Sequence, residues 1–433
     1  MNELLNGRRR RWSLIPLFLV LVLGTALIVH TRRSLHAATT ANVVYVETNA
    51  GCGKDANAVF GWTNVGGKLS LIAGEPITTG WLTGGTGVCD YNQVKGITEF
   101  DADQQVIISS KNNPPLLYAV NGHSNNFSGF QIAPGGVLSG LIGSPYKIPT
   151  GTDPVSIGFL YNILSGNESW LGIVNKGADP GQTNQAPNIT GFKVDSAGVP
   201  QAVTKAVVTL TAGTSPSQLI TAAGSTAKKL YLGFLDQYQT QGESLAGVDS
   251  YKILGDVGLS LINFAANPVD PPTLGLALNP TARVLYAGFP TLNEVGVFFY
   301  DANKGTISFS TAFPDPGKGV GWLVVGPPSI GHGGSFLYAS EPGSGTITVY
   351  SLTFLGTNLT QVQHFTLSGT TPSAGNLAFD PTGNYLYCLD SAHAMLHVLN
   401  IDQKKGTLTE TNSPTAIAAG SGEWPLGLAT GQF

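Results

Sequence analysis

A short apolar pair of the Leu-Tyr type recurs seven times along this chain, and its spacing constrains the fold more than any other feature. Consecutive copies lie between 49 residues apart, from Leu337 to Leu386, and 73 residues apart, from Val44 to Leu117. The clearest copies begin at Leu117, Leu230, Leu285, Leu337 and Leu386, and looser copies begin at Val44 and at Leu171 in the run 170–174. The chain also holds 56 Gly and 26 Pro, the residues of turns between short strands. A period of about 50 residues in such a sequence indicates the blades of a β-propeller.

The best-preserved repeat, residues 374–416, shows what one blade contains. Its expected strands lie at 376–379, 385–389, 395–401 and 407–409. Between the first two strands, Pro381 presets φ and Gly383 accepts a positive φ, so the chain turns sharply there. The same order of strands and turns recurs over residues 274–309. The repeat therefore predicts blades of four antiparallel strands.

The two ends of the repeat region predict how the ring closes. Residues 43–47 resemble the second strand of a blade, and residues 425–429 resemble an isolated inner strand. The last segment can thus supply the inner strand that the first blade lacks, which removes the open sheet edges. The sequence predicts an all-β fold over residues 42–433, a seven-bladed β-propeller closed by its C-terminal inner strand.

The N-terminus has the pattern of an export signal or a membrane anchor, assigned to residues 1–41. Four arginines, Arg8 to Arg11, precede an apolar run at 14–29, and small residues follow. This run places the N-terminus in the cytoplasm, and it contacts a membrane permanently only if it is not cleaved. Residues 42–433 are therefore expected outside the cytoplasm, whether secreted, periplasmic or at the cell surface.

Cysteine usage is consistent with an oxidising compartment. Cys52 and Cys89 flank the long first repeat, whose 73-residue spacing indicates an insertion, and they are candidates for a disulfide. Cys388 lies inside an apolar strand pattern and is expected to be a buried free thiol.

Composition and motifs exclude several classes of protein. A net charge of −4 argues against a general nucleic-acid binder, and 42% hydrophobic residues with 11% charged residues exclude a disordered chain. The sequence contains no His-Glu-x-x-His, Gly-x-Ser-x-Gly, Cys-x-x-Cys or Walker loop motif. No cofactor or metal is therefore expected.

The repeat resembles the seven-bladed propellers of the lactonase-like group and the related surface propellers with a Tyr-Val-Thr-Asn repeat. The resemblance covers about residues 42–433, and the segment 380–387 is its most specific part. Members of the lactonase-like group bind sugar-acid lactones on one face of the ring, and a Gly-Pro-Arg-His sequence often opens their inner strands. In this chain the matching positions 371–376 and 423–426 lack both the Arg and the His. No catalytic residue of the group is therefore carried over.

Polar residues in the loops at one mouth of the channel are the candidates for binding. Two kinds of loop meet at that mouth, those joining the second and third strands and those leading into the inner strand. The first kind offers His123, Asp236, Glu341 and His393, and the second kind offers His332 and Glu423. Carboxylates and imidazoles in such a ring suit a sugar, an amine or a metal, but acidic residues in turns also serve as ordinary turn formers.

Two functions remain open from the sequence. The first is an exported or anchored binding module that presents its channel face to a small molecule, a glycan or a protein partner, in line with the missing catalytic motifs. The alternative is a lactonase-like hydrolase outside the cytoplasm that acts on a sugar-acid lactone. Convergence of His123, His332 and His393 at one mouth would favour the hydrolase.

Overall fold

The computed structural model describes residues 40–49, 57–79, 104–122, 124–177, 186–212, 214–224, 229–239, 246–267, 273–279, 281–326, 335–353, 355–410, 412–417 and 425–433. Contacts within the chain separate Met1–Thr40 from Ala41–Phe433, and every described strand belongs to the second unit. Over these ranges the one helix is the 3-10 turn η3 (Ser165–Asn167), and no helix has the length and apolarity to cross a bilayer. The predicted export segment lies outside the described residues apart from its last two positions.

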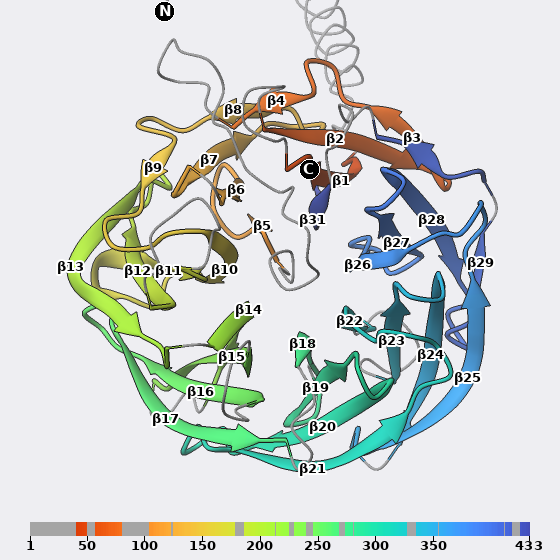
Figure 1. Ribbon diagram of the computed structural model, residues 1–433. Helices are drawn as coiled ribbons and strands as arrows, with labels where there is room; N and C mark the ends of the chain where they lie inside the picture. The colour runs from red at the N-terminus through yellow and green to blue at the C-terminus, as the bar shows by residue number, and fades with distance from the viewer. Residues whose placement is uncertain are drawn as a thin grey trace, which may run out of the picture. The chain divides into compact units, whose positions relative to one another are not determined.

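Seven antiparallel sheets surround a common centre in the unit Ala41–Phe433 (Figure 1). The described part of each sheet has four strands along its path, and three sheets carry one short additional strand. The seven-bladed, all-β fold predicted from the repeat is therefore confirmed.

Each blade runs from an inner strand near the centre of the ring to an outer strand at its rim. In that order, blade 1 consists of β31 (Leu426–Gln432), β1 (Asn42–Glu47), β2 (Ala58–Val65) and β3 (Lys68–Leu71), with β4 (Ile77–Thr78) beside β2. Blade 2 consists of β5 (Val106–Ser109), β6 (Leu116–Asn121), β7 (Asn126–Ile132) and β8 (Leu138–Gly140), with β9 (Tyr146–Lys147) beside β7. Blade 3 consists of β10 (Pro154–Leu160), β11 (Ser169–Asn175), β12 (Asn188–Val194) and β13 (Pro200–Thr209).

Blade 4 consists of β14 (Thr214–Ala223), β15 (Tyr231–Gln239), β16 (Gly247–Ile253) and β17 (Leu259–Ala266). Blade 5 consists of β18 (Leu274–Leu278), β19 (Val284–Phe289), β20 (Glu294–Tyr300) and β21 (Ile307–Pro314). Blade 6 consists of β22 (Leu323–Val325), β23 (Phe336–Glu341), β24 (Thr346–Thr353) and β25 (Asn358–Thr366). Blade 7 consists of β26 (Ala374–Phe379), β27 (Tyr385–Asp390), β28 (Met395–Ile401) and β29 (Leu408–Glu410), with β30 (Thr415–Ala416) beside β28.

Blade 1 joins the two ends of the repeat region, as the sequence predicts. The inner strand β31 pairs antiparallel with β1, with Tyr45 opposite Ala429. The pairing ends on two backbone hydrogen bonds between Ala41 and Phe433, at N···O distances of 2.7 and 3.0 Å. The described part of blade 1 therefore closes the ring through a strand ladder.

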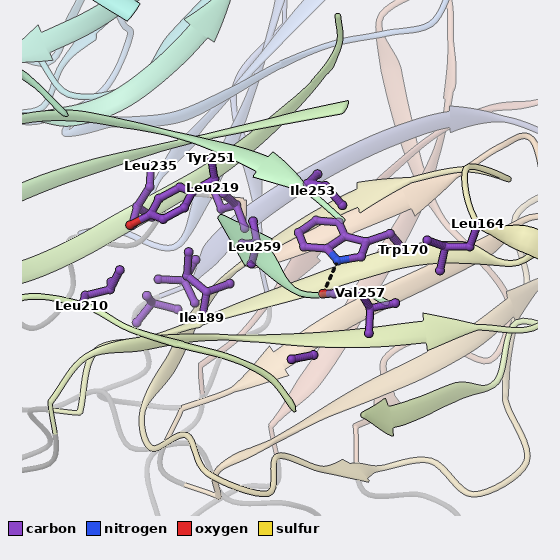
Figure 2. Packing of buried hydrophobic residues seen from close by; sticks show 13 residues of the cluster. Leu164, Trp170, Ile189, Leu210, Leu219, Leu235, Tyr251, Ile253, Val257 and Leu259 are labelled. Carbon is purple, nitrogen blue, oxygen red and sulfur yellow. Dashed lines mark hydrogen bonds between the residues drawn. The ribbon is translucent and has the colours of Figure 1, made fainter. Parts of the chain in front are cut away.

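The hydrophobic core of the described residues is divided into seven clusters, one at each junction between neighbouring blades. Figure 2 shows the cluster between blades 3 and 4, in which Trp170 and Ile189 from blade 3 pack with Leu219 and Leu259 from blade 4. This division follows from the strand pattern, because each sheet is apolar on both faces and must pack against a neighbour on either side.

The tyrosine of the repeated pair ties five of the described blades to the next one. In four of them its buried hydroxyl group donates to a backbone carbonyl in the turn between the third and fourth strands of the following blade. The acceptors are the carbonyls of Gly136 for Tyr45 (2.5 Å), Gly198 for Tyr118 (2.7 Å), Gly356 for Tyr286 (2.7 Å) and Gly406 for Tyr338 (2.8 Å). The hydroxyl of Tyr387 accepts instead from the Asn64 side chain of blade 1, at 2.7 Å. The pair therefore recurs because one inter-blade bond recurs.

Blade 3 forms this link without a tyrosine. Gly172 occupies the equivalent position, and the Trp170 ring fills the space beside it, 2.2 Å from where a Cβ of residue 172 would lie. The indole Nε1 donates to the carbonyl of Val257 in blade 4 at 3.0 Å, the bond drawn in Figure 2. The predicted marker at Leu171 is thus in the right register.

In blade 4 the predicted position of the repeated pair is wrong. When blade 4 is aligned with the other blades by the pairing of its second and third strands, Phe234 occupies the tyrosine position. The predicted pair Leu230-Tyr231 therefore lies too early in the chain. Phe234 has no hydroxyl group, and Ser250 opposite it donates to the carbonyl of Gly305 in blade 5 at 2.5 Å. Blade 4 therefore keeps the inter-blade hydrogen bond, but the donor is a residue of the third strand instead of the second strand.

Candidate active site

A polar residue recurs at the mouth-side end of the second strand in most of the described blades. These residues are Asn121, Asn175, Gln237, Glu341 and Asp390, and each side chain is buried. Blade 5 has the apolar Phe289 at the matching position, against which Gly296 packs. The second strands are buried on both faces, so these polar groups are buried too and each of them needs a partner.

In three blades a partner lies on the third strand, two positions beyond the residue directly opposite. The amide of Asn121 donates to Ser128 Oγ at 3.2 Å, and that of Asn175 donates to Thr190 Oγ1 at 3.2 Å. In blade 6 the backbone N–H of Thr348 donates to Glu341 Oε1 at 2.9 Å. These polar groups therefore hold the hairpin between the second and third strands together.

Blade 7 uses the same position differently, because Asp390 holds a histidine of the adjoining turn. The Nδ1 of His393 lies 2.9 Å from Asp390 Oδ2 and 3.0 Å from Oδ1, and the backbone N–H of His393 also donates to Oδ1 at 3.2 Å. The Asp390 side chain is 4% exposed whereas the His393 side chain is 41% exposed. A buried carboxylate thus orients a solvent-facing imidazole in the turn between β27 and β28.

The pairing also decides which nitrogen of His393 carries the proton. A carboxylate only accepts hydrogen bonds, so Nδ1 must be the donor and the neutral ring keeps its lone pair on Nε2. No hydrogen bond joins Nε2 to another described residue. This is the arrangement by which a carboxylate and a histidine prepare a general base.

Asp236, another predicted candidate, serves the inner strands instead. It lies within β15, fully buried, rather than in the loop that the sequence suggested. Its carboxylate accepts from Ser217 Oγ at 2.6 Å and from the backbone N–H groups of Ser217, Gln218 and Gly275 at 3.2, 2.6 and 3.1 Å. Burial raises the pKa of Asp236 to about 6, although these four donors act in the opposite direction. The residue therefore joins β14 to β18 across the junction of blades 4 and 5.

Glu341, also expected in a loop, is the fully buried last residue of β23 and lies near a second carboxyl group. Burial first, and then the charge of Asp315, raise the pKa of Glu341 above that of an ordinary glutamic acid. Asp315 accepts from the hydroxyl of Tyr350 at 2.6 Å, and burial raises its pKa as well. One of the two carboxyl groups therefore keeps a proton at a pH at which an exposed pair would be ionised.

The remaining predicted positions divide into two groups. His123, His332 and Glu423 lie outside the described residues, as do the disulfide candidates Cys52 and Cys89. The three candidates that are described belong to different blades, Asp236 to blade 4, Glu341 to blade 6 and His393 to blade 7. Cys388 is a buried free thiol, as predicted. Within the described ranges no group of three or more His, Cys, Asp or Glu side chains has the geometry to hold a metal ion.

Sequence reasoning missed Asp315, which lies in the Pro-Asp-Pro-Gly segment before β22. It also missed Asp249 as a buried carboxylate. The available signal for Asp249 was its place in β16, where an inward-facing position of an alternating strand carries an acid.

Comparison with known proteins agrees with the fold. Residues 275–422 match the family described as lactonase, 7-bladed beta-propeller, and this segment contains both Asp390 and His393. A search of curated proteins finds no sequence match. The chain is a seven-bladed β-propeller that resembles the lactonase group, as the repeat and the segment 380–387 predict.

Several solved structures share the fold at low sequence identity. The periplasmic gluconolactonase of Pseudomonas aeruginosa superposes with a TM-score of 0.63 and 13% identity, over 90% of this chain and 99% of that chain. A putative 6-phosphogluconolactonase from Bacteroides fragilis gives 0.60 and 17%, over 90% and 98%. A protein from Lactobacillus plantarum gives 0.61 and 14%, over 90% and 99%. At these identities the likeness concerns the fold.

Proposed function

We propose that the protein hydrolyses a lactone of a sugar acid, with His393 as the general base and Asp390 as the residue that orients it. The observation that carries this proposal is the contact of a 41% exposed imidazole with a buried carboxylate at the turn between β27 and β28. The family match over residues 275–422 supports the same reaction class, as do the names of the gluconolactonase structures with this fold. The alternative that the sequence left open is thus better supported than a role in binding alone.

The reaction needs little more than an oriented base. Nε2 of His393 accepts a proton from water, and the oxygen of that water forms a bond to the lactone carbonyl carbon. The ring C–O bond then breaks, and the proton held on the imidazole passes to the leaving alkoxide. One lactone and one water give one hydroxy acid. The buried charge of Asp390 stabilises the imidazolium that forms between these steps.

The test is hydrolysis of D-glucono-δ-lactone by the full-length protein, followed by base uptake at constant pH with the spontaneous rate subtracted. We expect His393→Gln to lower kcat/KM by about 10²–10⁴-fold, the usual contribution of a general base. His364→Gln is the matched control, because His364 is an exposed histidine on the outer strand β25, away from blade 7, whose Nδ1 lies 2.9 Å from Thr348 Oγ1. A wild-type rate equal to the spontaneous rate, or equal rates in the His393 variant and the control, would refute the proposal.

A second variant separates water attack from covalent catalysis. Ser391 is 4% exposed and next in sequence to Asp390, and its hydroxyl finds no hydrogen-bond partner among the described residues. If water is the nucleophile, Ser391→Ala keeps the wild-type rate. Loss of activity in Ser391→Ala with a normal melting temperature would instead assign the nucleophile to Ser391.

We further propose that the enzyme works outside the cytoplasm, in line with the arginine-led apolar segment at 14–29. The periplasmic location in the name of the Pseudomonas aeruginosa gluconolactonase supports this placement. Fractionation of cells that produce the full chain or a chain without residues 1–39 is the test. We expect only the full chain outside the cytoplasm, and equal distribution of the two chains would contradict the proposal.

A further inference from the structure

A cavity of about 260 Å³ lies at the junction of blades 3 and 4, between the end of β13 and the strands β15, β16 and β17. Its walls combine polar side chains with an apolar part that includes Leu210, Leu261 and Phe264. Leu261 is 54% exposed, so the apolar wall continues to the surface of the protein. The proposed lactonase residues lie in blade 7, and none of them lines this cavity.

One acidic side chain, Asp249 of β16, faces this cavity. It is 5% exposed. Its Oδ2 accepts from the hydroxyl of Tyr251 at 2.8 Å and from the side-chain amide of Gln237. Figure 2 shows Tyr251 and Leu210 toward the same end of the hydrophobic cluster, away from Trp170, and both residues line the cavity.

The charge of Asp249 has neutral partners only. Tyr251 and Gln237 contribute hydrogen bonds without a compensating charge, and no ion pair within the described residues includes Asp249. Burial raises the pKa of Asp249 to about 6, with both hydrogen bonds acting against that rise, so the group is mainly ionised at pH 7. A buried carboxylate without a cation is costly, and a cationic ligand would offset that cost.

We propose that this cavity is a second binding site, for a small organic ammonium compound with an aromatic or branched apolar body. The ammonium group pairs with Asp249, and the body lies against Leu210, Leu261 and Phe264. Ligand sites usually enclose about 300–1,000 Å³, and this cavity of about 260 Å³ lies just below that range, so it takes only a small ligand. This site is independent of the proposed lactone hydrolysis.

The charge requirement gives a direct test with two probes of the same shape. Isothermal titration of the full-length protein at pH 7.5 compares benzylamine with benzyl alcohol. We expect benzylamine to bind at least about tenfold more tightly, because only its ammonium group meets the carboxylate. Lowering the pH to 5 protonates Asp249, and we expect a further loss of about tenfold in benzylamine affinity. Tyr251 is the other titratable side chain that lines the cavity, and burial raises its pKa, so it stays neutral over this range.

Two variants and one control complete the test. Asp249→Asn keeps the shape and removes the charge, so benzylamine should bind no better than benzyl alcohol. Thr209→Trp alters an exposed wall residue and should block the cavity with the carboxylate intact. Asp256→Asn, in the exposed turn between β16 and β17, should bind as the wild type does. Equal affinity of the wild type for both probes, or unchanged benzylamine binding in either cavity variant, would overturn the proposal. If Asp249→Asn does not fold, Thr209→Trp decides alone.

Discussion

Removing one inter-blade hydroxyl tests why the Leu-Tyr pair recurs. In Tyr338→Phe the ring stays in place, fully buried, and only the hydrogen bond to the Gly406 carbonyl is lost. A buried carbonyl that loses its donor costs about 1–3 kcal/mol. Unfolding entropy is about 2.1 cal/mol/K per residue, so for the unit Ala41–Phe433 this cost lowers Tm by about 1–4 °C.

Scanning calorimetry and urea unfolding measure that change. The matched control is Tyr161→Phe, because Tyr161 lies in a turn, is 39% exposed and forms no inter-blade bond among the described contacts. Ser250→Ala should cost a similar amount to Tyr338→Phe, since Ser250 makes the equivalent bond to Gly305. If Tyr338→Phe unfolds at the same temperature and urea concentration as the control, the hydroxyl does not explain the repeat.

Two further predictions concern buried groups that packing constrains. The pKa of Glu341 is higher in the folded protein, through burial and the nearby Asp315, so the folded state binds more protons than the unfolded chain. Wild-type stability should therefore fall as the pH rises above the ordinary pKa of glutamic acid, and Glu341→Gln should flatten that slope in urea midpoints from pH 4 to 9. An unchanged slope would contradict the assignment. Gly275 has a φ of +72°, and a Cβ there would lie 2.1 Å from the carbonyl oxygen of Gly321. We expect Gly275→Ala to cost about 2 kcal/mol or more in urea unfolding. Gly166→Ala is the control, because Gly166 has a φ of +78° and open space around it. Equal losses of stability in the two variants would show that backbone strain alone, and not the contact with Gly321, causes the loss.

The fold could be predicted because one physical requirement repeats in every blade. Each sheet needs an apolar second strand and a bond to the next blade, so the Leu-Tyr pair returns at the spacing of a blade. The prediction failed locally in blade 4, where Leu230-Tyr231 resembles the pair but Phe234 occupies its register. In this blade the inter-blade hydrogen bond comes from Ser250 of the third strand, so the second strand carries no tyrosine that would mark its register in the sequence.

Only part of the candidate site could be predicted from the sequence. His393 could be found, because an aspartate three residues earlier in a tight turn can reach its ring. Asp236 and Glu341 were assigned to loops, but both lie in strands and are fully buried. The sequence does not reveal how far a strand extends before the turn, and burial decides whether a carboxylate is a structural partner or part of an open site.

The most direct test of the central claim is a double-mutant cycle on lactone hydrolysis. It compares kcat/KM for D-glucono-δ-lactone in the wild type, His393→Gln, Asp390→Asn and the double variant. Because Asp390 acts only through His393, by orienting its ring and stabilising its imidazolium, we predict that the double variant is no slower than His393→Gln, with strongly non-additive effects. Fully additive losses, or wild-type rates in His393→Gln, would contradict the account.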